Sequence, residues 1–434
     1  MDRRKETAAA FAVGCLTGFA IYTLASSVRN QRSKKVDSKA PISSQVPYIK
    51  KPSAGSVAGG LRPHQHEEKI KKRIENNSKL ELEDDTQLRL IHEEVISEHA
   101  IERKSVTVRV PATSANMGPG YDCLGVALNI WSEVTISRSD KFKIIYEGEG
   151  ENMVPCDESN LLVTGAKAAF KAAGKPMPML EYHCINRIPY ARGMGSSSAA
   201  IVAGLIGGLV LAGHKLPCWG SEELLQLACS IEGHPDNVAP VIYGGCQLGI
   251  HNGERWQSER VQLPSGIQVV LFIPDFIGKT SDARGVLEST VTRDEAVFNI
   301  GRVAWLINAL STGNLDNLKA GCQDALHQPQ RSHKVYPFLN QMVEAAIKAG
   351  ANAAYLSGAG PTVAAVTSGA SGDIFTQRAA ERVDKQVAEA MVRAALETKV
   401  NGKVFITNPV ESGAYVVRAD PEFSVGIIKY KGAV

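Results

Sequence analysis

A loop rich in glycine and serine stands between a strand-like run and a long uncharged run. Residues 188–198 read IPYARGMGSSS, and residues 199–213 after them carry no charge. Glycines let a backbone approach a ligand closely, and the first N–H groups of a helix are unpaired and lie at the positive end of its dipole. The pattern therefore predicts phosphate binding by Pro189, Gly193, Gly195, Ser196, Ser197 and Ser198.

Two better-known phosphate loops do not fit these residues. The form G-x-x-x-x-G-K-[ST] needs a lysine, which residues 188–198 lack, and the form G-x-G-x-x-G would need glycine in place of Ser198. Lys279 and Thr280 could end a lysine-containing loop, but Ile273 stands where its first glycine should be. Taken alone, residues 188–198 are also compatible with a serine-capped turn before a buried helix.

Two further segments favour the phosphate interpretation. Residues 111–125 read PATSANMGPGYDCLG, and residues 356–362 read LSGAGPT. Together with the central loop, they resemble in order the three signature motifs of the GHMP small-molecule kinases. Residues 232–240, EGHPDNVAP, lie between the second and third motifs. This segment and the first motif resemble the homoserine kinase branch in particular, and the resemblance runs from Val106 to the C-terminus.

The resemblance implies an α+β GHMP kinase fold. It pairs an N-terminal domain like domain 2 of ribosomal protein S5, placed at residues 105–264, with a ferredoxin-like C-terminal domain at residues 265–434. The sequence pattern agrees, because strand-like and helix-like runs mix without strict alternation. Strands are expected at 106–110, 128–136, 142–146, 179–188, 269–273, 353–356, 362–366 and 414–417. Helices are expected at 160–173, 199–213, 221–230, 296–310, 339–349 and 377–397.

ATP and Mg²⁺ are the cofactors that the resemblance implies. The central loop would hold the phosphates, and Gly358 and Gly360 would close the far side of the nucleotide site. Ser197 stands at the Mg²⁺-associated position, although the adjacent Ser198 leaves the register ambiguous. Mg²⁺ prefers hard oxygen ligands, and Glu232 matches the acidic residue before the family's His-x-Asp-Asn segment. A surface carboxylate at a helix end is the alternative for Glu232.

The implied acceptor is L-homoserine, which would become O-phospho-L-homoserine on the way to threonine. Asp122 is expected to meet the substrate hydroxyl, either as a base or as an orienting acceptor, since an unperturbed aspartate is a poor base at pH 7. Turn formation is the alternative for Asn116 and Asp122, and a helix-terminal structural role is the alternative for His234. The family's homoserine-pocket positions correspond to Asn116, Asp122, His234, Asn237 and Thr280.

Arg284 and Arg331 match family positions near the substrate carboxylate and the transferring phosphoryl group. A guanidinium can hold either anion through two hydrogen bonds, although both residues could also be surface arginines. With Asp122 they form the expected catalytic set. Two other functions stay open. A mevalonate-type GHMP kinase would not need two arginines for an amino-acid carboxylate, and a catalytically silent binding protein would have no reason to keep the whole set.

The first 104 residues are predicted to be an extension in three parts. Residues 7–28 carry no charge, are flanked by basic residues and are long enough to span a bilayer. We expect a membrane anchor or a cleaved or organelle-targeting segment there, with a soluble helix as the third alternative. Residues 31–79 are polar and indicate a linker. Apolar spacing at residues 80–101 indicates an amphipathic helix before the enzyme proper.

Composition limits the remaining possibilities. A formal net charge of +3 in 434 residues gives no sign of nucleic-acid binding. The eight cysteines are scattered and include no C-x-x-C pair, which argues against a disulfide framework or a zinc site. That pattern favours a reducing compartment, either the cytoplasm or the interior of a plastid or other organelle. The sequence leaves the oligomeric state open, a homodimer included.

Overall fold

The computed structural model describes residues 102–213, 220–368 and 382–422. The predicted apolar segment 7–28, the linker 31–79 and the helix 80–101 lie outside the described residues. Within the described residues, no helix is both long enough and apolar enough to cross a membrane.

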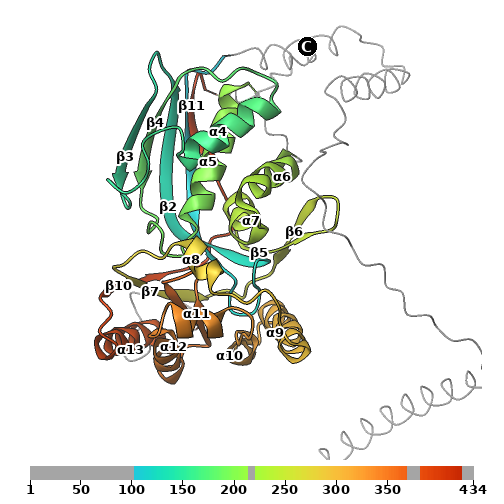
Figure 1. Ribbon diagram of the computed structural model, residues 1–434, viewed down its shortest axis with the longest axis vertical. Helices are drawn as coiled ribbons and strands as arrows, with labels where there is room; N and C mark the ends of the chain where they lie inside the picture. Colours follow the sequence, from blue (N-terminus) through green and yellow to red (C-terminus); the bar gives the residue numbers. More distant parts are fainter. Residues whose placement is uncertain (1–101, 214–219, 369–381, 423–434) are drawn as a thin grey trace, which may run out of the picture. The chain divides into compact units, whose positions relative to one another are not determined.

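A seven-stranded sheet contains most of the first half of the described chain (Figure 1). All its strand pairs are antiparallel except β3 with β4. Side chains along β4 are alternately buried and half-buried, as expected when one face of a sheet packs on a core. The strand order is β11 (Tyr415–Asp420), β1 (Ser105–Ala115), β2 (Leu124–Arg138), β4 (Leu180–Asn186), β3 (Lys143–Gly148), with β5 (Cys246–His251) paired to β2 and to β6 (Trp256–Val261).

Helix α5 (Ser196–Leu211) contacts β1 and β2 of this sheet, and α4 (Leu161–Ala172) packs against α5. Helices α6 (Gly220–Glu232) and α7 (Pro235–Tyr243) follow. Helix α5 is apolar on nearly every side because neighbouring elements surround it. Gly204 explains how close α4 and α5 come, since a Cβ atom there would lie 2.1 Å from the carbonyl oxygen of Leu162. This packing holds α5 in place, and α5 begins at the predicted phosphate loop.

A four-stranded antiparallel sheet carries the second half. Strand β7 is buried on both faces, and its alternate side chains pack into two different hydrophobic cores. This explains why residues 269–273 are all apolar. Val269 and Leu271 face the core shared with the first sheet, whereas Val270 and Phe272 pack among α12 and α13. The strand order is β10 (Gly402–Thr407), β7 (Gln268–Pro274), β9 (Val363–Thr367), β8 (Ala353–Leu356). The helices are α8 (Thr280–Gly285), α9 (Arg293–Thr312), α10 (Leu318–Gly321), α11 (Gln328–Lys334), α12 (Leu339–Lys348) and α13 (Val383–Glu397), with a 3₁₀ turn at Leu315–Asn317.

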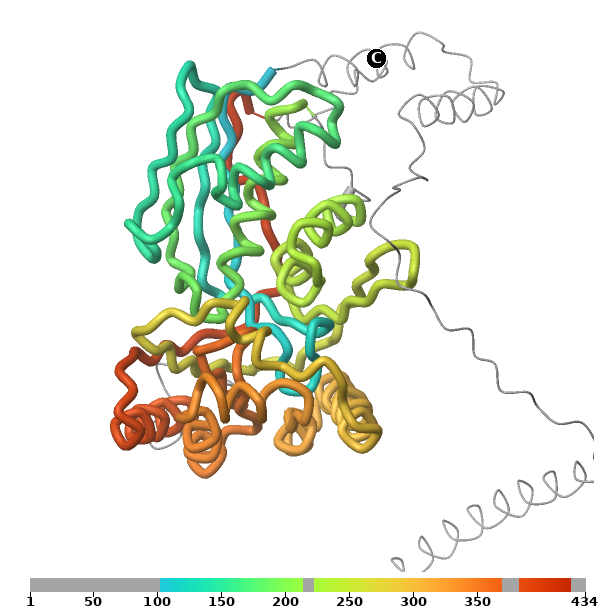
Figure 2. Tube along the Cα trace, viewed as in Figure 1, coloured from blue at the N-terminus to red at the C-terminus, as the bar shows by residue number. Residues whose placement is uncertain are grey.

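The α+β class is confirmed, and each expected strand and helix is present with its ends shifted by a few residues. The expected helix at 377–397 is described only from residue 382, where α13 starts at Val383. Seven helices and strands of the described residues were not expected from the sequence, nor was the 3₁₀ turn; the seven are α7, α8, α10, α11, β5, β6 and β10. Residues 265–434 were predicted to form the second domain, but β11 within them pairs with β1 in the first sheet. Figure 2 shows this end of the described chain, in red, running beside the blue start.

Candidate active site

A cleft of about 440 Å³ brings the predicted motifs together. Three predicted nucleotide-binding residues, Pro189, Ser198 and Gly360, do not line it. Ser198 is fully buried, and a side chain at Gly360 would collide with Tyr336. The predicted residues that do line the cleft are Asn116, Asp122, Gly193, Gly195, Ser196, Ser197, Glu232, His234, Asn237, Thr280, Arg284, Arg331 and Gly358.

The predicted phosphate loop is pressed tightly against its neighbours. A Cβ atom on Gly195 would lie 1.9 Å from Thr113 Oγ1, and one on Gly193 would lie 2.2 Å from the Ser357 carbonyl oxygen. Both glycines have left-handed φ angles, of 70° and 73°. Helix α5 begins directly after Gly195, and no side chain of the described residues caps its first N–H groups. These groups are therefore suited to an anion in the cleft.

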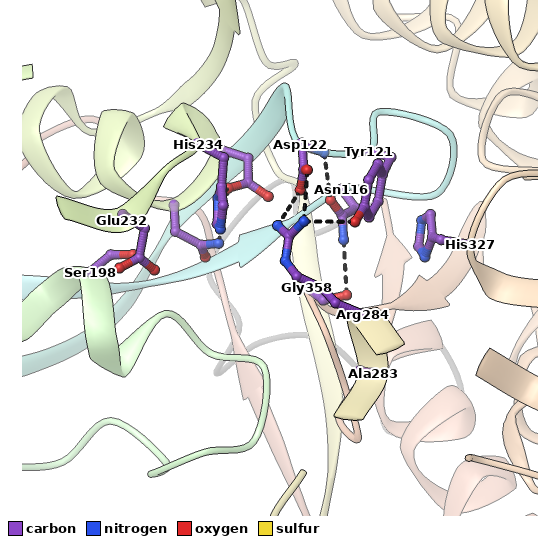
Figure 3. Close-up of polar contacts among 12 residues, drawn as sticks. Asn116, Tyr121, Asp122, Ser198, Glu232, His234, Ala283, Arg284, His327 and Gly358 are labelled. Atoms are coloured by element: carbon purple, nitrogen blue, oxygen red, sulfur yellow. Dashed lines mark hydrogen bonds and ion pairs between the residues drawn. The ribbon is translucent and has the colours of Figure 1, made fainter. Parts of the chain in front are cut away.

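Ser197 and Ser198 both donate hydrogen bonds to Glu232 Oε1, each over 2.9 Å. Of the two serines, Ser197 lines the cleft and Ser198 is buried, so Ser197 is the one whose hydroxyl faces a ligand in the cleft. Glu232 ends α6 and lines the cleft (Figure 3). Among the described residues, its Oε2 accepts no hydrogen bond. A serine hydroxyl beside a carboxylate oxygen is a donor set that suits Mg²⁺.

Asp122 and Arg284 form a two-bonded ion pair at another part of the cleft (Figure 3). Arg284 Nη2 lies 2.6 Å from Asp122 Oδ1, and Nη1 lies 3.0 Å from Oδ2. Arg284 Nη1 also donates to the Tyr121 hydroxyl over 2.8 Å. Burial alone would lower the pKa of Arg284, but the hydrogen bond and charge of Asp122 outweigh burial and raise that pKa. Arg284 is therefore a fixed cation in the cleft.

Asn116 links the first signature motif to the third. Its Oδ1 accepts the Asp122 N–H over 3.0 Å, and its Nδ2 donates to the Gly358 carbonyl over 2.9 Å. Asn116 and Asp122 both have positive φ angles, of 67° and 58°, so the turn-forming alternative is also true of them. The turn places both side chains at the cleft. The turn-forming role of Asn116 and Asp122 is therefore compatible with their predicted role in the site.

His234 and Asp236 form a hydrogen-bonded pair between Nδ1 and Oδ1. Burial alone would lower the pKa of His234, but Asp236 outweighs this through its hydrogen bond and charge, so that the pKa is raised. His234 is the N-cap residue of α7, yet its side chain makes no capping bond. Asp122 lies close to the pair, with one ligand atom from each of the three residues within 4.8 Å of the others. The group offers two carboxylates to a cationic ligand.

Arg331 is buried, with 1% of its surface exposed, yet it lines the cleft. Its Nε donates to the Ala283 carbonyl over 3.0 Å, and its Nη1 donates to the Gly358 carbonyl over 3.0 Å and to His327 Nδ1 over 3.1 Å. Its Nη2 has no hydrogen-bond partner among the described residues. The Tyr121 ring packs near both guanidinium groups, and its centroid lies 5.5 Å from Arg284 Cζ and 5.5 Å from Arg331 Cζ. Burial lowers the pKa of Arg331.

Two predicted substrate residues have distinct surroundings. Asn237 Oδ1 accepts a hydrogen bond from Thr113 Oγ1 over 2.7 Å, and its Nδ2 donates to Asp236 Oδ1 over 3.2 Å. Both polar atoms of the Asn237 amide are therefore hydrogen-bonded within the protein, and Asn237 and Thr113 pack directly against Gly195. Thr280 begins α8 and lines the cleft one turn from Arg284.

Three site residues were missed in the sequence. Tyr121 and Asp236 stand inside the quoted motifs, next to or near residues that were selected. His327 stands four residues before Arg331 in the sequence. This i, i+4 spacing could have indicated a contact between His327 and Arg331, because it puts two side chains on the same side of a helix.

Comparisons with known proteins give matches over the same part of the chain. Residues 160–245 match the family of GHMP kinases N terminal domains, and residues 306–393 match the GHMP kinases C terminal family. The chain is 38% identical over 312 residues to a homoserine kinase of Desulfitobacterium hafniense, covering 72% of this chain and 100% of that protein. It is 45% identical over 262 residues to a homoserine kinase of Moorella thermoacetica, covering 60% and 87%.

Solved structures show the same fold. A homoserine kinase from Cytophaga hutchinsonii is similar with a TM-score of 0.63 and 26% identity, covering 73% of this chain and 98% of that one. The Streptococcus pneumoniae phosphomevalonate kinase in complex with phosphomevalonate and AMPPNP is similar with a TM-score of 0.53 and 12% identity, covering 70% and 100%. At that identity, the second comparison concerns the fold alone.

Proposed function

The chain belongs to the homoserine kinase family of the GHMP kinases, and we propose that it transfers the γ-phosphate of ATP to the side-chain hydroxyl of L-homoserine. The product is O-phospho-L-homoserine, a precursor of threonine. One observation carries this proposal: a helix N-terminus suited to phosphate and a charged pocket suited to an amino acid share a single cleft. Phosphoryl transfer depends mainly on holding its two reactants in line and on stabilising charge.

The donor end is formed by the loop before α5. The uncapped N–H groups after Gly195 bind the ATP phosphates, and the close packing of that glycine on Thr113 keeps the loop in place. Ser197 and Glu232 would hold Mg²⁺, since their oxygens lie together at the cleft. Bound there, the ion neutralises charge on the phosphates.

The acceptor end is formed by charged side chains of both signs. The Asp236 carboxylate, which lines the cleft, suits the ammonium group of homoserine. Arg331 keeps Nη2 free of protein partners among the described residues, so this nitrogen suits the substrate carboxylate. Arg284, next to Asp122, suits the phosphoryl group in transit. A sugar or mevalonate has no ammonium group to place beside the Asp236 carboxylate, which favours an amino acid as the acceptor.

Asp122 acts as an orienting acceptor in this proposal. Both of its oxygens already accept hydrogen bonds from Arg284, which holds the carboxylate in one orientation at the cleft. The carboxylate therefore aligns the homoserine hydroxyl, and the proton leaves on the transferred phosphate.

ADP release by the full chain tests the proposal, with homoserine, serine, threonine, mevalonate and galactose offered in parallel. We expect kcat/KM for homoserine to exceed that for mevalonate and galactose by orders of magnitude. Comparable turnover of mevalonate would contradict the assignment. No ADP release with any acceptor would instead favour the silent binding protein.

A further inference from the structure

His327 lies behind the acceptor pocket and has no role in the function proposed so far. Its side chain is fully buried, it immediately precedes α11, and its ring packs 5.3 Å from the Tyr121 ring, centroid to centroid. A buried imidazole needs partners for both ring nitrogens. The identity of those partners decides what the ring can do.

The two partners fix the protonation state of His327. Nε2 lies 2.8 Å from the Gly118 carbonyl oxygen, which can only accept, so Nε2 carries a hydrogen. Nδ1 lies 3.1 Å from Arg331 Nη1, which can only donate, so Nδ1 carries a lone pair. A second proton would have to sit on Nδ1 and face the Arg331 cation. The geometry therefore requires the neutral imidazole.

The charged groups around the ring agree with that assignment. Arg331 faces Nδ1, the Asp324 carboxylate lies 3.5 Å from Nε2, and the charge of Asp122 also acts on the ring. Asp324 is itself committed to backbone N–H groups, including that of His327. Burial lowers the pKa of His327, and the charge of Arg331 acts in the same direction against the opposing charge of Asp324.

The contact with His327 also completes the anchoring of Arg331. Both hydrogens of Nη1 are used, one by His327 Nδ1 and one by the Gly358 carbonyl, and Nε is used by Ala283. One edge of the planar guanidinium is thereby fixed, which determines the direction of Nη2. The same imidazole holds Gly118, which precedes Tyr121 and Asp122 in the first motif.

We propose that His327 is a positioning residue with two separable contacts: Nδ1 aims Arg331 Nη2 at the carboxylate of homoserine, and Nε2–H holds the turn that carries Asp122. This inference rests on the proposed function. The Nδ1 contact governs homoserine binding, and the Nε2 contact governs alignment of the hydroxyl. Neither contact reaches the ATP phosphates.

Three substitutions in the full-length protein separate the two contacts. His327→Asn keeps a hydrogen-bonding group near the Nδ1 position, His327→Gln keeps one near the Nε2 position, and His327→Leu keeps neither. We expect His327→Gln to raise the homoserine KM roughly 10–100-fold and His327→Asn to raise it much less while lowering kcat. His327→Leu should show both defects. The ATP KM should stay unchanged in all three.

An amino alcohol without a carboxylate provides the decisive readout. 3-Aminopropan-1-ol retains the ammonium and hydroxyl groups of homoserine, and its inhibition constant can be measured against homoserine in each variant. Because it offers nothing to Arg331 Nη2, its inhibition constant should not change in His327→Gln. The inference is overturned if that constant and the homoserine KM rise by the same factor, or if all defects follow the loss of thermal stability. Wild-type protein that fails to phosphorylate homoserine would contradict the proposed function instead.

Discussion

The carboxylate of Asp122 and the guanidinium of Arg284 are joined by two hydrogen bonds of 2.6 and 3.0 Å across 162 residues of sequence. The pair connects the first signature motif to α8, which belongs to the second half of the described chain. Each side chain therefore fixes the other at the point where we place the reacting hydroxyl. This pairing makes the role of Asp122 open to a direct test.

Asp122→Ala should lower kcat by roughly 10²-fold or more with little change in the ATP KM, because alignment of the acceptor hydroxyl is lost. Asp122→Asn separates alignment from proton removal, since the amide keeps one acceptor oxygen but is no base. Steady-state kinetics with homoserine and ATP measure both variants. If Asp122→Asn is as inactive as Asp122→Ala, the orienting role is wrong and a base is required. An unchanged kcat with a raised ATP KM would move Asp122 to the donor end.

Glu232→Gln should preserve the fold and raise the Mg²⁺ concentration needed for half-maximal activity, because one unit of ligand charge is removed. Ser197→Ala should change the Mg²⁺ dependence in the same direction. Ser198→Ala is the matched control: its hydroxyl bonds the same Glu232 oxygen but is buried away from the cleft. That variant should lose about 1 kcal/mol of unfolding free energy and keep the Mg²⁺ curve of wild type. Overlapping curves for all three variants would show that Glu232 is not a ligand.

Gly195→Ala should greatly reduce kcat/KM for ATP, because the added Cβ atom would lie 1.9 Å from Thr113 Oγ1 and displace the loop. Gly174→Ala provides the control. Gly174 has a similar φ of 64°, but a Cβ atom added there would meet no atom within 4 Å, and the residue does not line the cleft. The Gly174→Ala substitution should lower the free energy of unfolding by about 1–2 kcal/mol through backbone strain alone, and it should leave the ATP KM unchanged. Equal kinetic defects in both variants would show that strain, not the loop, is responsible.

His234 and His327 should affect stability with opposite dependence on pH. The pKa of His234 is raised in the folded protein, so its contribution is fully present below its unfolded pKa and is lost as pH rises through the folded value. The pKa of His327 is lowered, so its contribution is present above its unfolded pKa and is lost as pH falls. Urea unfolding between pH 5 and about 8 measures both. His234→Gln should remove the loss at rising pH, and an unchanged profile would count against the His234–Asp236 pair.

The donor end of the site was predicted from sequence because its chemistry is local. Gly195, Ser197 and the start of α5 are consecutive in the chain, so their spacing alone specifies the arrangement. The acceptor end is different, because His327 reaches the Gly118 carbonyl across 209 residues. Strand β11 likewise pairs with β1 from the other end of the described chain. A local pattern indicates that a segment is a strand or helix but not which distant segment it meets.

The last prediction concerns residues 7–28, which lie outside the described residues. They carry no charge and stand between basic clusters, and such a segment is costly to leave in water and is recognised by membrane-targeting machinery. We propose that residues 7–28 either anchor the protein in a membrane or direct it to an organelle, and that in the second case they are then removed.

A protein beginning at Leu80 should keep its kinase activity, because β1 starts only at Ser105. Fractionation of cells that make the C-terminally tagged full chain distinguishes the outcomes: full-size protein that resists carbonate extraction indicates an anchor, and a shortened soluble product indicates cleavage. Leu16→Asp combined with Ile21→Asp is the matched control, since each charge costs about 2.5–3.5 kcal/mol at the centre of a membrane span. Full-size protein spread through the cytosol, with wild type and the control alike, would refute both alternatives.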